Sequence, residues 1–183
     1  MNKNNGQPFA ALIFDLDGTL IDSAPDVCAS INRVLTANGR RALTLDEAKD
    51  MVGWGGRVLV EKALTRTAEP GSEKVTEEEI DAGLSDFLAT YAAHPVENSI
   101  VFPGVIEALD QFKADGVAMG LCTNKPEATT GPVVDAMGLG GYFTVLACGD
   151  AVPHRKPDGR PALYVTEALG ADVAVPENGV SLL

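Results

Sequence analysis

Two aspartates that follow an apolar run are the residues in this chain best suited to chemistry. The run 10–14 is continuously apolar, and Asp15, Asp17, Gly18 and Thr19 come directly after it. Such a run is typical of a central parallel strand, and ligands bind outside the carboxyl ends of the strands in an open parallel sheet. In a regular strand the two carboxylates, two residues apart, would lie on one face, where they repel each other and need a cation or a shared proton. Mg²⁺ prefers oxygen ligands and also binds phosphate, so the pair indicates a magnesium and phosphate site.

Polar side chains also follow a second apolar run. The run 117–122 ends at Thr123 and Asn124, where a hydroxyl and a backbone N–H could hold a phosphoryl group. Lys156 precedes another helical pattern, and its ammonium could balance the charge of two carboxylates and a phosphate. Each feature also has a plain structural interpretation, as a strand end or as an exposed loop residue. Their occurrence together favours one shared site.

The elements that must position these residues alternate only in part of the chain. A strand pattern at 10–14 is followed by purely helical patterns and then by alternating helices and strands, including a third apolar run at 143–148. Helices without strands cannot extend a parallel sheet. We therefore predict an α/β fold in which a Rossmann-like parallel-sheet core, residues 8–22 and 97–183, is interrupted by an all-helical cap domain, residues 23–96.

Two helix starts in the predicted cap carry a recognisable pattern. Thr44 with Glu47, and Thr76 with Glu79, have the spacing of capping boxes. In a capping box the two side chains satisfy backbone N–H groups that the first helical turn leaves free. We therefore expect helices to begin at both places.

The segment Asp-x-Asp-Gly-Thr-Leu resembles the first signature of the haloacid dehalogenase superfamily. Thr123 resembles the second signature of that superfamily and Lys156 the third. The Arg-Lys-Pro-Asp sequence around Lys156 and the helical insertion are similar to its phosphoglycolate phosphatase branch. The resemblance implies that Asp15 attacks phosphorus and forms an aspartyl-phosphate, while Asp17 is the general acid and base. It also implies Lys156 as a third catalytic residue and Mg²⁺ held by Asp15 and the backbone carbonyl of Asp17.

A glycine-rich segment, residues 52–56, resembles the cap loop that closes over substrate in this branch. Its glycines let backbone approach a ligand closely, and Arg57 could meet a substrate carboxylate with two hydrogen bonds. The alternative is a flexible connector whose Trp54 packs between the domains. The residues expected to bind phosphate or substrate are Thr19, Thr123, Asn124, Gly53 and Arg57.

The fourth signature of the superfamily is absent. Relatives have a strand that ends in Gly-Asp with a further Asp, whereas residues 170–175 begin like that strand and continue into Pro176 and Glu177. Because Mg²⁺ takes six oxygen ligands, we expect weak magnesium binding and a large loss of rate. Glu177 is a poor replacement, since Pro176 disfavours a regular strand. We expect a truncated, frame-shifted or incomplete chain.

The composition limits the class of partner and the location. The net charge of −12 argues against nucleic acid, which requires clustered Lys and Arg. No apolar run is long enough to cross a bilayer, and residues 1–8 are polar. Cys28, Cys122 and Cys148 form no CxxC pair, which favours buried reduced thiols in a cytoplasmic protein. The sequence leaves the oligomeric state open.

The expected function is hydrolysis of a small phosphate monoester, with 2-phosphoglycolate as the preferred substrate and Mg²⁺ as the cofactor. A related sugar-phosphate mutase is an alternative, as is a phosphonate hydrolase, which needs a cap lysine such as Lys49 or Lys62. A degenerate phosphatase fold that binds a phosphorylated ligand or a partner without turnover is a third. A phospho-accepting signalling domain ranks last because it lacks a helical insertion. His94 is expected at a hinge.

Overall fold

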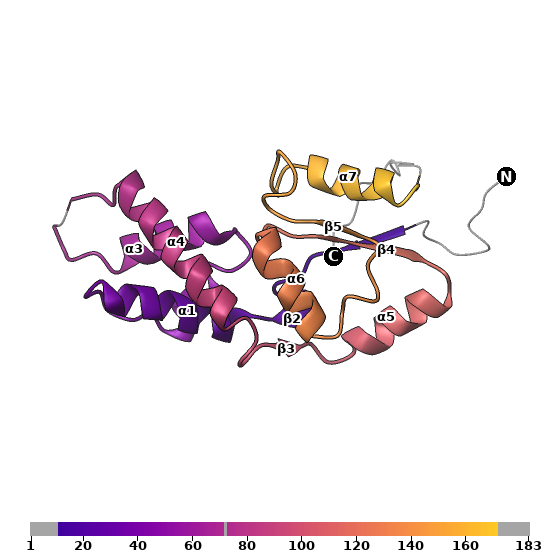
Figure 1. Cartoon of the computed structure of the whole chain (residues 1–183), viewed down its shortest axis with the longest axis horizontal. Helices are drawn as coiled ribbons and strands as arrows, with labels where there is room; N and C mark the ends of the chain where they lie inside the picture. The colour runs from indigo at the N-terminus through magenta and orange to yellow at the C-terminus, as the bar shows by residue number, and fades with distance from the viewer. Residues whose placement is uncertain (1–10, 72, 172–183) are drawn as a thin grey trace.

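The computed structural model describes residues 11–71 and 73–171. A group of helices lies beside a small sheet that has its own helices, so the molecule is elongated (Figure 1). The elements follow the order β1 (Ala11–Phe14), β2 (Ile21–Asp22), α1 (Ala24–Ala37), α2 (Leu45–Lys49), α3 (Gly56–Arg66), α4 (Glu77–Ala93), β3 (Ile100–Val101), α5 (Val105–Ala114), β4 (Ala118–Cys122), α6 (Glu127–Ala136), β5 (Val145–Ala147) and α7 (Arg160–Ala168).

A parallel sheet forms the α/β part of the molecule. In the described residues its strand order is β1-β4-β5, with Ile13 opposite Gly120 and Gly120 opposite Val145. The helix α7 covers one face of the sheet, and α5 and α6 lie on the other (Figure 1). A Cβ added to Gly120 would lie 2.3 Å from Cγ1 of Val165, so β4 and α7 approach closely because Gly120 has no side chain. The predicted α/β class is confirmed.

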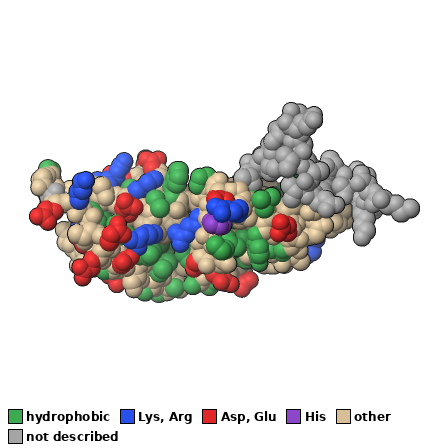
Figure 2. Space-filling view, turned by 90° about the horizontal axis from the view of Figure 1, so that it is seen from above, with side chains coloured by type: hydrophobic (Ala, Val, Ile, Leu, Met, Phe, Trp, Pro, Cys, Tyr) green, Lys and Arg blue, Asp and Glu red, His purple; other side chains and the backbone are tan. Residues whose placement is uncertain are grey.

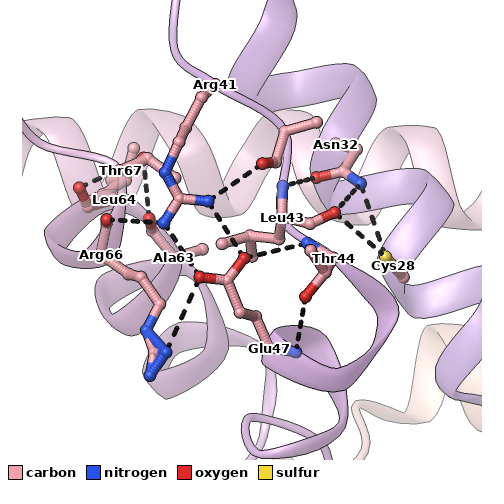
Figure 3. Close-up of polar contacts among 11 residues, drawn as sticks. Cys28, Asn32, Arg41, Leu43, Thr44, Glu47, Ala63, Leu64, Arg66 and Thr67 are labelled. Atoms are coloured by element: carbon pink, nitrogen blue, oxygen red, sulfur yellow. Dashed lines mark hydrogen bonds and ion pairs between the residues drawn. The ribbon is translucent and has the colours of Figure 1, made fainter.

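The helices α1 to α4, here called the cap helices, follow β1 and β2 in the chain and pack on one another. Both predicted capping boxes are present, at the start of α2 and at the start of α4. Figure 3 shows the first of them, in which Glu47 also accepts hydrogen bonds from both terminal nitrogens of Arg41. These bonds, and the bond from the Thr44 backbone, lower the pKa of Glu47 to about 2. The loop before α2 is thereby tied to the helix that follows it.

A buried carboxylate joins the two chain segments that connect the cap helices to the sheet. Asp26, in the first turn of α1, accepts hydrogen bonds from the backbone N–H groups of Glu97, Asn98 and Ser99 and from the side chains of the last two. The short strands β2 and β3 pair antiparallel beside it. His94 ends α4, and its Nδ1 lies 2.8 Å from Oε1 of Glu97.

The surface carries both signs of charge. Figure 2 shows acidic and basic side chains interspersed on the end of the molecule formed by the cap helices. Among the described helices, none has the length and apolar character needed to cross a membrane. The three cysteines are buried free thiols.

The structure contains elements that the sequence did not predict, and some of the predictions concern residues that it does not describe. The helix α6 was not predicted, because Pro132 and two threonines obscure its pattern. The strands β2 and β3 have two residues each and leave too short a pattern to detect. The expectations for Asp172, for residues 173–175 and for Glu177 lie outside the described residues.

Candidate active site

Asp15 lies just beyond the end of β1, at the carboxyl edge of the parallel sheet. Its Oδ1 is 2.8 Å from Nζ of Lys156 and accepts a hydrogen bond of 2.8 Å from the backbone N–H of Leu16. The two donors fix one carboxylate oxygen, while the side chain as a whole stays partly exposed. A carboxylate held in this way is suited to act as a nucleophile, because little orientational freedom remains to be lost in the reaction.

Asp17 meets a different lysine. Nζ of Lys125 is 3.2 Å from Oδ1 of Asp17 and 3.5 Å from Oδ2, and Ser23 Oγ also donates a hydrogen bond to this carboxylate. The side chains of Asp17 and Lys125 are only 8% and 7% exposed. Burial, the largest single effect, would lower the pKa of Lys125, but Asp17 and Tyr91 together outweigh burial and raise it. The two aspartates are therefore neutralised separately, one by Lys156 and the other by Lys125.

The predicted relation between the two aspartates needs one correction. The spacing of Asp15 and Asp17 predicted two side chains on one face of a regular strand, but β1 ends at Phe14 and both residues belong to the turn that follows. Thr19 lies in the same turn, and its N–H donates to the carbonyl of Leu16. In this turn the two carboxylates contact different partners, Lys156 and Lys125.

The end of β4 brings three chain segments together through one amide. Nδ2 of Asn124 donates to the carbonyls of Gly53, at 3.0 Å, and Lys156, at 3.2 Å, and its Oδ1 accepts from the Lys156 N–H at 2.9 Å. The preceding residue, Thr123, is buried, and its Oγ1 accepts from the N–H of Lys125. Asn124 therefore connects the loop after β4 with the cap loop and with the segment that holds Lys156.

The cap loop, residues 52–56, leads into α3 and reaches the loop after β4. Gly53 and Gly55 both have a φ of +89°, and a Cβ on Gly55 would lie 3.2 Å from the carbonyl oxygen of Asn124. Trp54 is 54% exposed, so the interpretation that it packs between domains is wrong. Nζ of Lys62 lies 4.6 Å from the Trp54 ring centroid. The glycines permit both the turn and its close approach to Asn124.

Arg57 is the predicted site residue that the structure does not bring to the others. Both terminal nitrogens of its guanidinium pair with carboxylates on α4, one with Asp81 and one with Glu77. These pairs raise the pKa of Arg57, with the Asp81 hydrogen bond as the largest cause. In this arrangement Arg57 fastens α3 to α4.

A cavity of about 40 Å³ lies between the cap helices and the loop after β4. Asp17, Lys125 and Tyr91 contribute its polar groups, and Gly53, Gly55 and Gly56 of the cap loop contribute backbone. The cation of Lys125 also lies 4.5 Å from the centroid of the Tyr91 ring. Neither Lys49 nor Lys62 lines this cavity.

Lys125 and Tyr91 were not predicted from the sequence. Lys125 directly follows Thr123 and Asn124, so its position next to two expected phosphate-binding residues was an available signal. Tyr91 belongs to the apolar stripe of α4 and carried no signal, since an aromatic residue at helical spacing is usually a core residue.

The oxygen atoms of Asp15 and of the residues beside it are of the chemical type that binds hard cations such as Mg²⁺. The carboxylate of Asp15 and the main-chain carbonyl of Asp17 are the ligand types that Mg²⁺ prefers. Over residues 11–71 and 73–171, no three His, Cys, Asp or Glu side chains gather in a way that could hold a metal ion. Water and a phosphate group would fill the remaining positions around an ion held by these donors.

Comparison with known proteins gives a consistent set of similarities. The model of the haloacid dehalogenase-like hydrolase family matches residues 9–179. Phosphoglycolate phosphatase 1 of Pseudomonas aeruginosa is 40% identical over 162 residues, which cover 88% of this chain and 58% of that protein. Phosphoglycolate phosphatase of Agrobacterium fabrum is 37% identical over 161 residues, which cover 88% of this chain and 67% of that protein.

Among solved structures, a predicted phosphoglycolate phosphatase from Haemophilus somnus 129PT has a TM-score of 0.84 at 29% identity, covering 91% of this chain and 74% of that one. This chain spans only 58% of the length of the Pseudomonas aeruginosa protein.

Proposed function

The chain belongs to the haloacid dehalogenase-like hydrolase family, and we propose that it is a Mg²⁺-dependent phosphatase that hydrolyses 2-phosphoglycolate to glycolate and phosphate. The observation that carries the proposal is the position of Asp15, held at the end of β1 by Lys156 and adjacent to Asp17. The names of the related proteins support the choice of substrate. The substrate is a small phosphorylated metabolite, in line with the names of these relatives.

The chemistry has two steps. A carboxylate oxygen of Asp15 attacks phosphorus and forms an aspartyl-phosphate while the ester P–O bond breaks, and Asp17 gives its proton to the leaving oxygen. Asp17 then takes a proton from water, which attacks phosphorus, releases phosphate and restores the Asp15 carboxylate.

The neighbouring residues support both steps. Lys156 orients Asp15 and offsets phosphoryl charge, and the backbone around Thr123 and Asn124 borders the phosphoryl group. The side chains of Asp15 and the carbonyl of Asp17 would hold Mg²⁺, whose charge neutralises the phosphoryl oxygens when it is bound. We further propose a cytoplasmic location, which the three buried free thiols favour.

The test is phosphate release from 2-phosphoglycolate with Mg²⁺, for the unchanged chain and for Asp15→Asn. Removing the nucleophile should lower the rate by at least about a thousandfold, and chelation of Mg²⁺ should also lower it. Asp86→Asn, which changes an exposed carboxylate on α4, is the matched control and should keep the rate. A rate that survives Asp15→Asn would contradict the proposal.

A second candidate is a fold that binds a phosphorylated ligand without turnover. It is favoured by the lack of a third acidic ligand near Asp15 within the part of the chain that the structure describes. Binding of 2-phosphoglycolate by a folded chain that releases no phosphate would support this candidate over the enzyme.

A further inference from the structure

The cavity wall contains a buried hydroxyl group without a partner. Tyr91, on α4, is 1% exposed, and its hydroxyl oxygen has no hydrogen-bond partner among the described residues. Buried polar atoms in proteins nearly always have a partner, and an exception requires an explanation. Because Tyr91 lines the cavity, a bound group that accepts a hydrogen bond would satisfy it.

A buried cation lies beside this hydroxyl. Nζ of Lys125 is 4.5 Å from the centroid of the Tyr91 ring, and its hydrogen bonds in the described residues all go to Asp17. An ammonium has three N–H donors, so it can serve a second carboxylate as well as Asp17. Burial raises the pKa of Tyr91, which keeps the phenol neutral and able to donate. When Asp17 carries the proton that it gives to the ester oxygen, the cavity offers a positive charge and a neutral O–H donor side by side.

The size and the remaining walls of the cavity limit what can enter. A water molecule needs about 10–15 Å³ by this measure, so about 40 Å³ holds about three non-hydrogen atoms. That is the size of one carboxylate group, and a sugar ring is much larger. The other side chains on the wall are mostly apolar, and they include Val27, Met51, Val52, Leu59 and Phe87. An apolar wall strengthens the attraction between Lys125 and an anion because it excludes water.

We propose that Tyr91 and Lys125 bind the carboxylate of the substrate and make the site selective for small phosphorylated hydroxy acids over phosphate esters that lack a carboxylate. The proposal rests on the proposed function, in which Asp17 protonates the ester oxygen. In 2-phosphoglycolate a single methylene separates that oxygen from the carboxylate. Lys125 lies 3.2 Å from Asp17, so the carboxylate falls within its reach when the ester oxygen contacts Asp17. The site then prefers a carboxylate because of the charge of Lys125, and it disfavours sugar phosphates because of the small volume of the cavity.

Two substrates of equal carbon number test this assignment, 2-phosphoglycolate and ethyl phosphate, of which only the first has a carboxylate. Tyr91→Phe removes one oxygen atom and should lower the preference for 2-phosphoglycolate, as a ratio of kcat/KM values, by about tenfold or more, mainly through KM. Lys125→Met should lower the ratio further. Tyr164→Phe, at a half-exposed tyrosine on α7, is the control and should keep the ratio. If Tyr91→Phe leaves the ratio unchanged, or Lys125→Met slows both substrates equally, the assignment is wrong.

The same comparison by binding separates this assignment from the proposed function. In the Asp15→Asn variant, calorimetry gives the dissociation constants of both compounds without turnover. Adding Tyr91→Phe to this variant should weaken the binding of 2-phosphoglycolate about tenfold relative to the binding of ethyl phosphate. That result would support the carboxylate site even if the chain released no phosphate. An unchanged ratio of dissociation constants would overturn the carboxylate site even in an active phosphatase.

Discussion

Lys156 touches Asp15 through one short ion pair, with 2.8 Å between Nζ and Oδ1. Replacing it by methionine keeps the length of the side chain but removes both the orienting bond and the positive charge near the phosphoryl group. Lys156→Met should therefore slow phosphate release by about 10²–10³-fold, and Lys156→Arg should recover part of the rate. Steady-state assays beside Lys49→Met, which changes an exposed lysine on α2, measure the effect.

The Lys49→Met control also addresses the phosphonate hydrolase alternative, in which a cap lysine would take part in the reaction. An unaltered rate for this variant agrees with a phosphatase. A loss as large as that of Lys156→Met would instead favour a reaction in which a cap lysine takes part.

The sequence allowed some of the candidate site residues to be predicted because they lie next to strand ends. Asp15 and Asn124 lie at the ends of apolar runs, and the structure brings both into contact with Lys156. Tyr91 could not be found in this way, because its proposed function depends on an unpaired hydroxyl that only the folded chain reveals. Arg57 has the positive charge needed to bind an anionic substrate, but in the structure its guanidinium pairs with two carboxylates of α4.

The connection after β5 passes against the loop after β4. The N–H of Gly149 donates to the carbonyl of Lys125 at 2.9 Å, and a Cβ on Gly149 would lie 2.2 Å from the carbonyl oxygen of Asn124. Gly149→Ala must therefore displace backbone, and we expect it to lower the free energy of unfolding by about 1–3 kcal/mol. Phosphate release should fall as well, because Asn124 and Lys125 move together.

A glycine on α6 provides a control substitution that should change the free energy of unfolding in the opposite direction. No atom lies within 4 Å of a Cβ built on Gly131, so Gly131→Ala should raise the free energy of unfolding by up to about 1 kcal/mol through helix propensity. Urea unfolding of both variants measures the pair. Equal stabilities for the two variants would show that the contact between Gly149 and Asn124 is not tight.

Elements were predictable where a local signal agreed with the fold. The starts of α2 and α4 follow from capping boxes, in which the partners are three residues apart. The helix α6 was missed because Pro132 lies inside it, where proline ordinarily disfavours a helix. Its place is set by tertiary packing, since Val133 and Val134 are buried in the core. A local pattern cannot contain that information.

At the scale of the whole molecule, one carboxylate joins the two chain segments that connect the cap helices to the sheet. Asp26 is buried, and five N–H or O–H groups of Glu97, Asn98 and Ser99, more than seventy residues along the chain, donate hydrogen bonds to it. Burial alone would raise the pKa of Asp26, but the bonds from Ser99 and Asn98 lower it below its ordinary value of 3.8. The charged form is therefore the one that the fold stabilises.

Asp26→Asn should lower the free energy of unfolding at pH 7 by about 2–4 kcal/mol. The hydrogen bonds to a charged carboxylate are replaced by bonds to a neutral amide, and the two N–H donors of that amide are buried where the surrounding groups are also donors.

The effect of this substitution should depend on pH. Because folding lowers the pKa of Asp26, its stabilising contribution is complete well above pH 3.8 and is lost as the pH falls through that value toward the lower pKa of the folded state. The difference in stability between the unchanged chain and Asp26→Asn should therefore shrink as the pH falls from about 6 to about 3, measured by urea unfolding at each pH. Glu167→Gln, which neutralises an exposed carboxylate on α7, should show no such convergence. A difference that stays constant over this range would mean that the charge of Asp26 does not hold the two connecting segments together, and that its shape alone does so.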